Sequence, residues 1–351
     1  MLMDFIEYKK AFHDRALALG LSPNAIEEAL KYAEQLHKKN LPIIYDQQHF
    51  CQLVGYDGEY VIAVANHAAS FYKEYSIPKK NGGLRKIHEP YPSLKEIQSW
   101  ILKQILTPAT KKFVSPVAKA YIPKLNVRDN ARFHKGQKYV LCLDLTDFFG
   151  SIHFSQVFSI FKNMGYSRPL AVLLSNLCVM KDALPQGAPT SPMLSNMVFK
   201  YYDDKIFEYC KAKKIRYTRY ADDLTFSGNL NCKEIISFIN RLLSKTSFVI
   251  NRSKTKIISN GNRQEVTGVI VNEKLQTSSI YRKKIRQEVY YIIKFGIDKH
   301  IKSIGWERPQ IEYVRHLLGK INFTLTINKN DSEMRKYYSY IHSLLKEYKS
   351  E

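Results

Sequence analysis

The sequence is poor in acidic residues and in cysteine, and it has no long hydrophobic run. Its 32 Asp and Glu stand against 54 Lys and Arg, which gives a formal net charge of +22 over 351 residues. Such an excess points to a polyanionic partner. No segment approaches the roughly 20 apolar residues of a membrane span. Asp4 and Glu7 interrupt the stretch where a signal peptide would be apolar, so we expect a cytoplasmic protein without a membrane partner.

Other absences narrow the class further. The five cysteines are odd in number, widely spaced and without a C-x-x-C pair, which excludes a disulfide framework and gives no indication of a zinc site. There is no repeat of fixed period and no low-complexity tract, so neither a solenoid nor a disordered binder fits. With 45% hydrophobic residues the chain can bury a sizeable core, and its length suggests two or three domains.

Hydrophobic patterning predicts a mixed fold. Residues 138–145, KYVLCLDL, suit a buried strand, and residues 215–228, IRYTRY then ADD then LTFSG, indicate strand, tight acidic turn and strand. Helical stripes lie between these strands, where Gly165 is a helix stop by its type and place. Helices dominate beyond about residue 270, with one stripe of Ile311, Val314, Leu318 and Ile321 and another of Met334, Tyr338, Ile341 and Leu345. We expect an α+β fold with helices on one face of a mainly antiparallel sheet. The expected parts are a helical region over 1–75, a core over 76–268 and a basic helical region over 269–351.

Three carboxylates form the most informative constellation. Asp144 ends the first strand, and Asp222 and Asp223 occupy the turn of the later hairpin. If those strands are neighbours, the carboxylates converge, and like charges held closely need cations to neutralise them. An all-oxygen site suits magnesium, and two such ions can activate a 3′-hydroxyl and stabilise leaving pyrophosphate. A solvent-exposed acidic turn is the alternative.

The surrounding motifs resemble a known family. DLTDFFGSI, LPQGAPTSP and RYADDLTFSG look like the catalytic blocks of reverse transcriptases, and this resemblance implies a right-hand polymerase with fingers, palm and a helical thumb. Two further blocks, NARFH at 130–134 and V-T-G at 266–268, are similar to blocks of retron reverse transcriptases. The resemblance covers roughly residues 75–351. One departure is Gly150, where the family commonly has proline, and we expect it to loosen that turn.

Residue roles follow partly from chemistry and partly from this resemblance. A Gly-rich turn and a basic extended segment from Asn81 to Pro90 predict a hairpin held over something anionic, and the segment alone favours a plain solvated basic hairpin. By the resemblance, it is the fingers hairpin that grips the incoming triphosphate, for which a forked guanidinium is well matched. The expected catalytic and metal ligands are Asp144, Asp222 and Asp223, with the main-chain carbonyl of Leu145. The expected nucleotide contacts are Arg85, Lys86, Phe149, Gln186, Gly187 and Lys254. The expected RNA contacts are Asn130, His134, Val266, Thr267, Gly268, Arg282, Lys283, Lys284 and Arg286.

Several of these residues also have plain structural readings. Phe149 would exclude a 2′-hydroxyl by the resemblance, yet it could be a core residue. P-Q-G alone is a turn, and Lys254, which could assist pyrophosphate departure, could be a solvated lysine. The generic readings of Asn130, His134 and V-T-G are a capped loop and a strand bend. The basic stretch at 281–294 could be one solvated helix face, although the net charge favours contact with structured RNA.

The resemblance implies an RNA-directed DNA polymerase of a retron. Such an enzyme uses Mg²⁺ and dNTPs and copies part of its own structured noncoding RNA into multicopy single-stranded DNA, priming from a 2′-hydroxyl of that RNA. The implied partners are this RNA, its DNA product, a host ribonuclease H that removes template, and a retron effector or toxin in antiphage defence. The alternatives are a group II intron-like or abortive-infection reverse transcriptase, or a catalytically silent RNA-binding palm protein.

Overall fold

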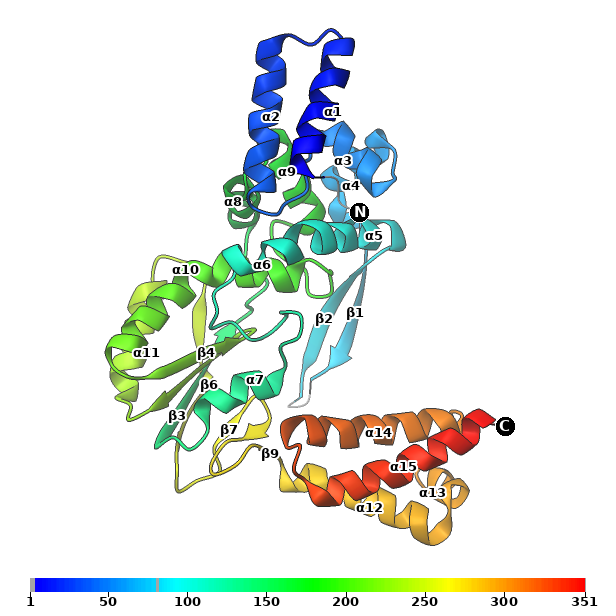
Figure 1. Cartoon of the computed structure of the whole chain (residues 1–351). Helices are drawn as coiled ribbons and strands as arrows, with labels where there is room; N and C mark the ends of the chain where they lie inside the picture. The colour runs from blue at the N-terminus through cyan, green and yellow to red at the C-terminus, as the bar shows by residue number, and fades with distance from the viewer. Residues whose placement is uncertain (1–3, 80–81, 351) are drawn as a thin grey trace. The chain divides into compact units, whose positions relative to one another are not determined.

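The computed structural model describes residues 4–79 and 82–350, so Asn81, where the predicted basic hairpin begins, lies outside the described residues (Figure 1). The chain forms two compact units that interleave along the sequence. The first combines Met1–Pro123, Leu145–Phe207 and Ile239–Ile250, and the second combines Lys124–Asp144, Glu208–Phe238 and Asn251–Glu351. None of the described helices is both long enough and apolar enough to cross a bilayer.

The first unit is mainly helical and carries one long hairpin. Strands β1 (Tyr72–Pro78) and β2 (Leu84–Pro90) pair antiparallel, with Ile77 opposite Arg85. Most of the hairpin is exposed, in line with a segment that holds something outside the core. The helices wholly within this unit are α1 (Phe5–Ala18), α2 (Pro23–His37), α3 (Gln47–Val54), α4 (Gly58–Asn66), α5 (Pro92–Trp100), α6 (Thr107–Phe113), α8 (Phe154–Met164) and α9 (Arg168–Cys178), with short helices η1 (Ala68–Phe71) and η2 (Ile101–Leu106).

A four-stranded sheet is the centre of the second unit. Its strand order is β4 (Arg216–Tyr220), β5 (Asp223–Gly228), β3 (Tyr139–Thr146) and β6 (Val249–Ser259), and β5 runs antiparallel to both β4 and β3. Helices α10 (Ser191–Ala212) and α11 (Cys232–Leu243) connect this sheet with the other unit along the chain. Before β3 lie α7 (Val127–Ala131) and η3 (Arg132–His134). A small sheet of β7 (Glu265–Val266), β8 (Val269–Ile270) and β9 (Gln276–Thr277) follows β6.

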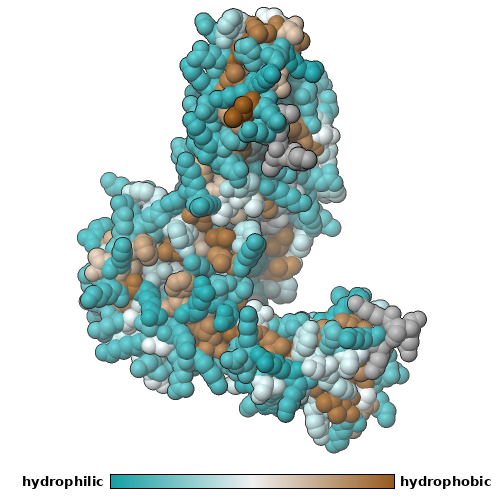
Figure 2. Space-filling view, in the orientation of Figure 1, coloured by the Kyte–Doolittle hydropathy of each residue, from teal (hydrophilic) through white to brown (hydrophobic). Residues whose placement is uncertain are grey.

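Four helices end the chain: α12 (Ser279–Phe295), α13 (Ile297–Ser303), α14 (Gln310–Ile327) and α15 (Ser332–Ser350). They enclose a core of their own, in which Val314, Ile321, Met334 and Ile341 are buried at the spacing predicted from the sequence. Because this core is separate from the sheet, the helices form a distinct packing layer. Figure 2 shows hydrophilic residues over most of the visible surface, as the abundance of charged residues requires.

The predicted α+β class is confirmed by these sheets and helices. The strand over KYVLCLDL, the hairpin around ADD and the helix that ends at Gly165 are all present, and Gly165 adopts the left-handed conformation of a helix stop with φ 109°. The boundary expected at residue 268 falls inside the second unit, since that unit continues from Asn251 to the end of the chain. The division into three parts stays a prediction.

Candidate active site

The acidic pair sits on a tight and strained turn. Strands β4 and β5 are joined by only Ala221 and Asp222, and Tyr220 pairs directly with Asp223. Ala221 has φ 59°, a region that costs a non-glycine residue about 1–3 kcal/mol. Arg219, fully buried, donates from Nη1 to the Ala221 carbonyl at 2.9 Å, which helps to hold this conformation. Strain of this kind is often kept at functional sites.

The third carboxylate lies on the neighbouring strand. Asp144 of β3 is the cross-strand partner of Asp223 of β5. Residues directly opposite one another in a sheet project to the same face, so the two carboxylates are neighbours there. The condition for convergence, that the two strands be adjacent, is therefore met. Leu145, whose main-chain carbonyl is an expected ligand, is the next residue of β3, and its side chain is buried.

The electrostatics of the pair favour a bound cation. The pKa of Asp223 is raised to about 6, mainly by burial and then by the charges of Asp222 and Asp144, while Lys254 and Lys256 act in the opposite direction. In the folded chain this carboxyl therefore prefers its proton, and ionising it as pH rises through 6 costs folding free energy. A nearby positive charge offsets that cost.

Lys254 supplies such a charge in the structure. Its ammonium donates to both carboxylate oxygens of Asp144 at 3.0 Å. Within the described residues no group of three or more His, Cys, Asp or Glu side chains is already gathered around one ion position. The donor chemistry nevertheless fits a hard divalent cation, because adjacent strands present carboxylate oxygens and the carbonyl of Leu145 and no nitrogen or sulfur ligand is needed. Lys254 thus contacts a predicted metal ligand, and its role in the departure of pyrophosphate stays a prediction.

The predicted triphosphate-binding residues lie on the hairpin of the first unit. Lys86 forms an ion pair with Glu74 across the hairpin at 3.1 Å, and both side chains are largely exposed. Arg85 is exposed, and its side chain has no hydrogen bond or ion pair among the described residues. Its forked guanidinium is therefore available to bind a phosphate group.

Gly187 is needed for a close approach of two backbone segments. It has φ 129°, and a Cβ atom placed there would lie 2.6 Å from the carbonyl oxygen of His88 in β2. The carbonyl of the preceding Gln186 accepts a hydrogen bond from the His88 amide at 2.7 Å. The backbone segment that approaches Gly187 is that of β2. The Q-G turn is thus fixed to the strand that carries Arg85.

The two adjacent phenylalanines have different environments. Phe148 is 3% exposed and packs edge-on against Phe199 and close to Phe248, so it is a core residue. Phe149 is only partly buried and lies beside Tyr121, with ring centroids 6.3 Å apart. Partial exposure leaves Phe149 free to contact a ligand, and its role against a 2′-hydroxyl stays a prediction.

The side chain of Asp147 explains why glycine occupies position 150. A Cβ atom at this position would lie 2.1 Å from Oδ2 of Asp147, so the carboxylate occupies the space that a proline or any other side chain would need. Asp147 itself adopts a positive φ of 42°, and its carbonyl accepts from the amide of Ser151 at 2.9 Å. The turn is thus hydrogen-bonded across its ends, and the expectation that glycine loosens it finds no support in these contacts.

The N-A-x-x-H and V-T-G blocks meet in a buried hydrogen-bond network. His134 bonds through Nε2 to Thr218 Oγ1 and through Nδ1 to Ser227 Oγ, both at 2.7 Å. Thr218 Oγ1 donates to Asn130 Oδ1 at 2.6 Å, and Asn130 Nδ2 donates to Thr267 Oγ1 at 3.4 Å. Thr218 lies on β4 and Ser227 on β5, so the network joins both blocks to the hairpin that carries the acidic pair.

Burial limits what these blocks can touch. Asn130 and His134 are 0% exposed, as is Val266, so none of the three side chains presents surface to an RNA. The expectation of direct RNA contact by these side chains finds no support in this burial, and their role in RNA binding stays a prediction. Thr267 and Gly268 form the turn between β7 and β8 with φ 48° and 83°, and Gly268 is exposed. Within V-T-G, only this turn remains accessible.

The basic stretch on α12 divides into paired and free cations. Glu333 accepts from Nε of Arg286 at 2.6 Å and from Nη2 of Arg282 at 3.0 Å, and Arg282 also reaches the buried Asp331. These pairs tie α12 to the start of α15. Lys283 and Lys284 are exposed and have no partner among the described residues. They are better placed than the two arginines to contact phosphate.

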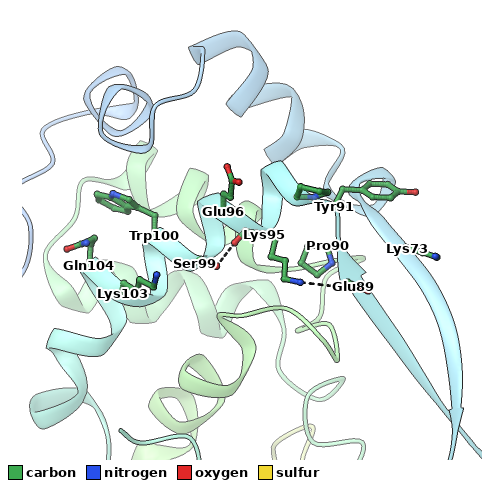
Figure 3. Close-up of a pocket in the computed structure, with 11 residues that line it drawn as sticks. Lys73, Glu89, Pro90, Tyr91, Lys95, Glu96, Ser99, Trp100, Lys103 and Gln104 are labelled. Carbon is green, nitrogen blue, oxygen red and sulfur yellow. Dashed lines mark hydrogen bonds and ion pairs between the residues drawn. The ribbon is translucent and has the colours of Figure 1, made fainter. Parts of the chain in front are cut away.

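One described pocket is lined by none of the predicted site residues. It has a volume of about 850 Å³ and is formed by the base of the β1–β2 hairpin, α5 and η2. Figure 3 shows Tyr91 and Trp100 at the two ends of α5, with Lys95 reaching Glu89 at 3.2 Å. Its lysines are partly balanced by two glutamates, so the lining has no strong charge preference.

Sequence reasoning missed the residues that support the site. Thr218, Arg219 and Ser227 support the acidic hairpin through their hydrogen bonds, yet each lies in a strand segment with no distinguishing pattern. The only hint was Arg219 within a predicted strand. Arginine is rarely fully buried, and Arg219 is fully buried here. Contacts between segments so far apart in the chain leave no local signal.

Comparisons with known proteins identify the family of this chain. Residues 77–303 match the family described as reverse transcriptase (RNA-dependent DNA polymerase). The retron Ec86 reverse transcriptase of Escherichia coli is 32% identical over 283 residues, covering 79% of this chain and 82% of the relative. The retron Ec83 reverse transcriptase of Escherichia coli is 32% identical, covering 77% of this chain and 87% of the relative. The retron Mx65 reverse transcriptase of Myxococcus xanthus is 31% identical, covering 74% of this chain and 66% of the relative. A solved telomerase from Candida albicans aligns with 78% of this chain at 11% identity and a TM-score of 0.45, a likeness too distant to bear on function.

Proposed function

This chain belongs to the reverse transcriptase family, in its retron branch, and we propose that it copies part of a structured noncoding RNA into multicopy single-stranded DNA that stays joined to the RNA. The enzyme is an RNA-directed DNA polymerase, with an RNA template and a DNA product. The retron relatives favour this function over that of a group II intron-like or abortive-infection enzyme. The three aspartates argue against a catalytically silent RNA-binding protein.

The carboxylates would carry the nucleotidyl transfer. Asp144, Asp222 and Asp223, with the carbonyl of Leu145, would hold two Mg²⁺ ions, which when bound lower the pKa of the attacking hydroxyl and neutralise charge on the phosphates. In the reaction a 3′-hydroxyl attacks the α-phosphorus of a dNTP, the new phosphodiester bond forms, and the bond to pyrophosphate breaks. The pairing of Asp144 with Asp223 beside the strained Ala221–Asp222 turn is the observation that carries this proposal.

Other residues would bind and orient the substrates. Arg85 and Lys86 would hold the triphosphate, and Gln186 and Gly187 would place the nucleotide against the template. Phe149 would exclude a ribose hydroxyl. Lys254, which contacts Asp144 at 3.0 Å, could give a proton to the departing pyrophosphate.

RNA recognition would use the accessible basic and turn residues. Lys283 and Lys284 are exposed on α12, and the V-T-G turn exposes Gly268. Phosphate contacts by such lysines make binding salt-dependent. Arg282 and Arg286 could join them only by sharing or leaving Glu333, because that carboxylate now accepts from both.

The wider system is proposed from the retron relatives. Synthesis would begin at a 2′-hydroxyl of the noncoding RNA, a host ribonuclease H would remove the copied template, and an effector or toxin protein would act with the complex in antiphage defence. We place the enzyme in the cytoplasm, where this RNA, the dNTPs and the nuclease are available.

Primer extension tests the chemistry. Purified protein should extend a DNA primer on an RNA template with dNTPs and Mg²⁺, and chelation should stop it. Asp222→Asn should abolish extension while RNA affinity is kept, because it removes a charge and little volume. Asp14→Asn, at an exposed position on α1, is the matched control and should retain wild-type activity. Equal extension by Asp222→Asn and wild type would remove the carboxylate assignment.

A further inference from the structure

We propose that Asn130, His134, Thr218 and Ser227 are positioning residues for polymerisation. They form one buried hydrogen-bond chain that fixes the hairpin on which Asp222 and Asp223 sit, and the N-A-x-x-H block acts through this hairpin on any template. The inference rests on the proposed polymerase function. It assigns a role to Thr218 and Ser227, and it gives Asn130 and His134 a task that does not require contact with RNA.

The donors and acceptors of these side chains fix one direction for the hydrogen-bond chain. Oδ1 of Asn130 can only accept, so the one proton of the Thr218 hydroxyl is committed to it at 2.6 Å. Thr218 Oγ1 must then accept from His134, which places the ring proton on Nε2. In the neutral ring Nδ1 carries no proton, and it accepts from the Ser227 hydroxyl at 2.7 Å. Each of these donors and acceptors is therefore matched by one partner.

A neutral ring is what the site enforces. His134 is completely buried, and burial lowers its pKa to about 3, with the charge of Arg216 as a smaller cause. A protonated ring would turn Nδ1 into a donor and break the acceptance from Ser227. Near neutral pH the imidazole thus works as a fixed link between two hydroxyl groups.

The chain anchors both strands of the catalytic hairpin on its active face. Thr218 is the cross-strand partner of Thr225, and Tyr220 is the partner of Asp223. Side chains alternate along a strand, so Thr218, Ser227 and Asp223 project to the same side of the sheet. Thr218 stands two residues, about 7 Å, before the position that pairs with Asp223. A shift of either anchored strand is therefore transmitted to the acidic turn over a short distance.

The Asn130 end of the hydrogen-bond chain is attached to a packed helix. Asn130 and Ala131 end helix α7, and Ala131 packs in a buried cluster with Val140, Val266 and Ile327. The helix is also joined to the end of α14, because Nε of Arg128 donates to the carbonyl of Ile327 at 3.2 Å. The hydrogen-bond chain therefore connects a packed helix to a turn that needs support, since Ala221 is held at φ 59°.

Two substitutions at Thr218 separate positioning from packing. Thr218→Val keeps the shape of the side chain and removes the hydroxyl, so Asn130 and His134 each lose a partner. Thr218→Ser keeps the hydroxyl and removes a methyl group, so the chain survives beside a small cavity. A merely structural residue would show loss of activity in step with loss of stability. A positioning residue shows activity that follows the hydroxyl.

The matched control is another buried histidine of the same unit. His300 is 4% exposed and hydrogen-bonds the hydroxyl of Tyr313 at 2.8 Å, far along the chain from the hairpin and within the core of the C-terminal helices. His300→Gln should lower the melting temperature and leave the rate of nucleotide insertion within about twofold of wild type, as expected for loss of a bond remote from the reacting groups.

The experiment measures single-turnover insertion on a generic primed RNA template, together with the KM for dNTP, RNA affinity and the melting temperature. Thr218→Val should lose about tenfold to 100-fold in rate with KM and RNA affinity unchanged, since misplacing reacting groups by about 1 Å costs up to that much. Thr218→Ser should stay within about threefold of wild type. Equal rates for Thr218→Val and wild type, or losses that simply follow the melting temperatures of all variants, would overturn the inference.

A second measurement does not need activity. Amide hydrogen exchange in the peptide that contains Asp222 and Asp223 should quicken in Thr218→Val and stay as in wild type in Thr218→Ser. Unchanged exchange in both variants would overturn the positioning role even if no template were extended. A wild-type protein that extends no template would instead overturn the proposed function. Failure of one idea is thus distinguishable from failure of the other.

Discussion

The buried imidazole of His134 makes the stability of this protein depend on pH in a calculable way. Its pKa is lowered from 6.5 to about 3 by burial, so the folded chain binds no proton there above about pH 4. The unfolded chain does bind one below pH 6.5. Because the unfolded state holds more protons, the free energy of unfolding falls as pH falls through 6.5 and continues to fall until about pH 3.

The magnitude follows from the two pKa values. Each unit of difference corresponds to about 1.4 kcal/mol, and between pH 7 and pH 5 the unfolded histidine changes from mostly neutral to mostly charged. The contribution of His134 to the free energy of unfolding should therefore fall by about 2 kcal/mol over that interval. His134→Gln removes this titration and keeps a side chain that can donate and accept hydrogen bonds.

Urea unfolding at pH 7 and pH 5 is the assay, with wild type and His134→Gln measured side by side. The variant should be less stable at pH 7, because its amide cannot reproduce both 2.7 Å bonds of the ring. Its loss of stability between the two pH values should be about 2 kcal/mol smaller than that of wild type. An identical pH dependence for the two proteins would show that His134 is accessible to protons, and the buried network would be wrong.

Three further predictions concern the substrate-binding elements. Phe149→Val should admit ribonucleotides and lower the selectivity for dNTP over rNTP by about tenfold or more in single-nucleotide insertion, and unchanged selectivity would make Phe149 a core residue only. Gly187→Ala should destabilise the protein by about 1–3 kcal/mol in urea, because the added Cβ meets the His88 carbonyl, and wild-type stability would refute that close approach. Lys283→Gln with Lys284→Gln should lower the slope of log RNA affinity against log salt by about 2, and an unchanged slope would show that these lysines bind no phosphate.

The sequence was sufficient for the elements whose signals are local. The apolar run before Asp144 and the alternation on both sides of the acidic pair predicted β3, β4 and β5. A strand with one or two buried faces needs apolar residues at alternate or consecutive positions, so its signal is local. The sequence did not predict that β3 and β5 are neighbours, which was only assumed. The pairing of Asp144 with Asp223 shows that they are. Gly165 and the stripes of the C-terminal helices were predictable for the same local reason.

Contacts between distant segments could not be predicted in this way. The partners of His134 are hydroxyl groups more than 80 residues away, and nothing near N-A-x-x-H distinguishes a buried imidazole from one that faces RNA. Whether the imidazole is buried depends on side-chain geometry in three dimensions, for which sequence spacing carries no information.

We propose that Asp144, Asp222 and Asp223 catalyse DNA synthesis on an RNA template that the protein itself selects. Wild type and Asp222→Asn should be purified from cells, and the bound nucleic acid should be sequenced after treatment with ribonuclease, with deoxyribonuclease or with neither. We expect one structured RNA on both proteins, and single-stranded DNA joined to that RNA on wild type alone. DNA of the same sequence and amount on both proteins would contradict it.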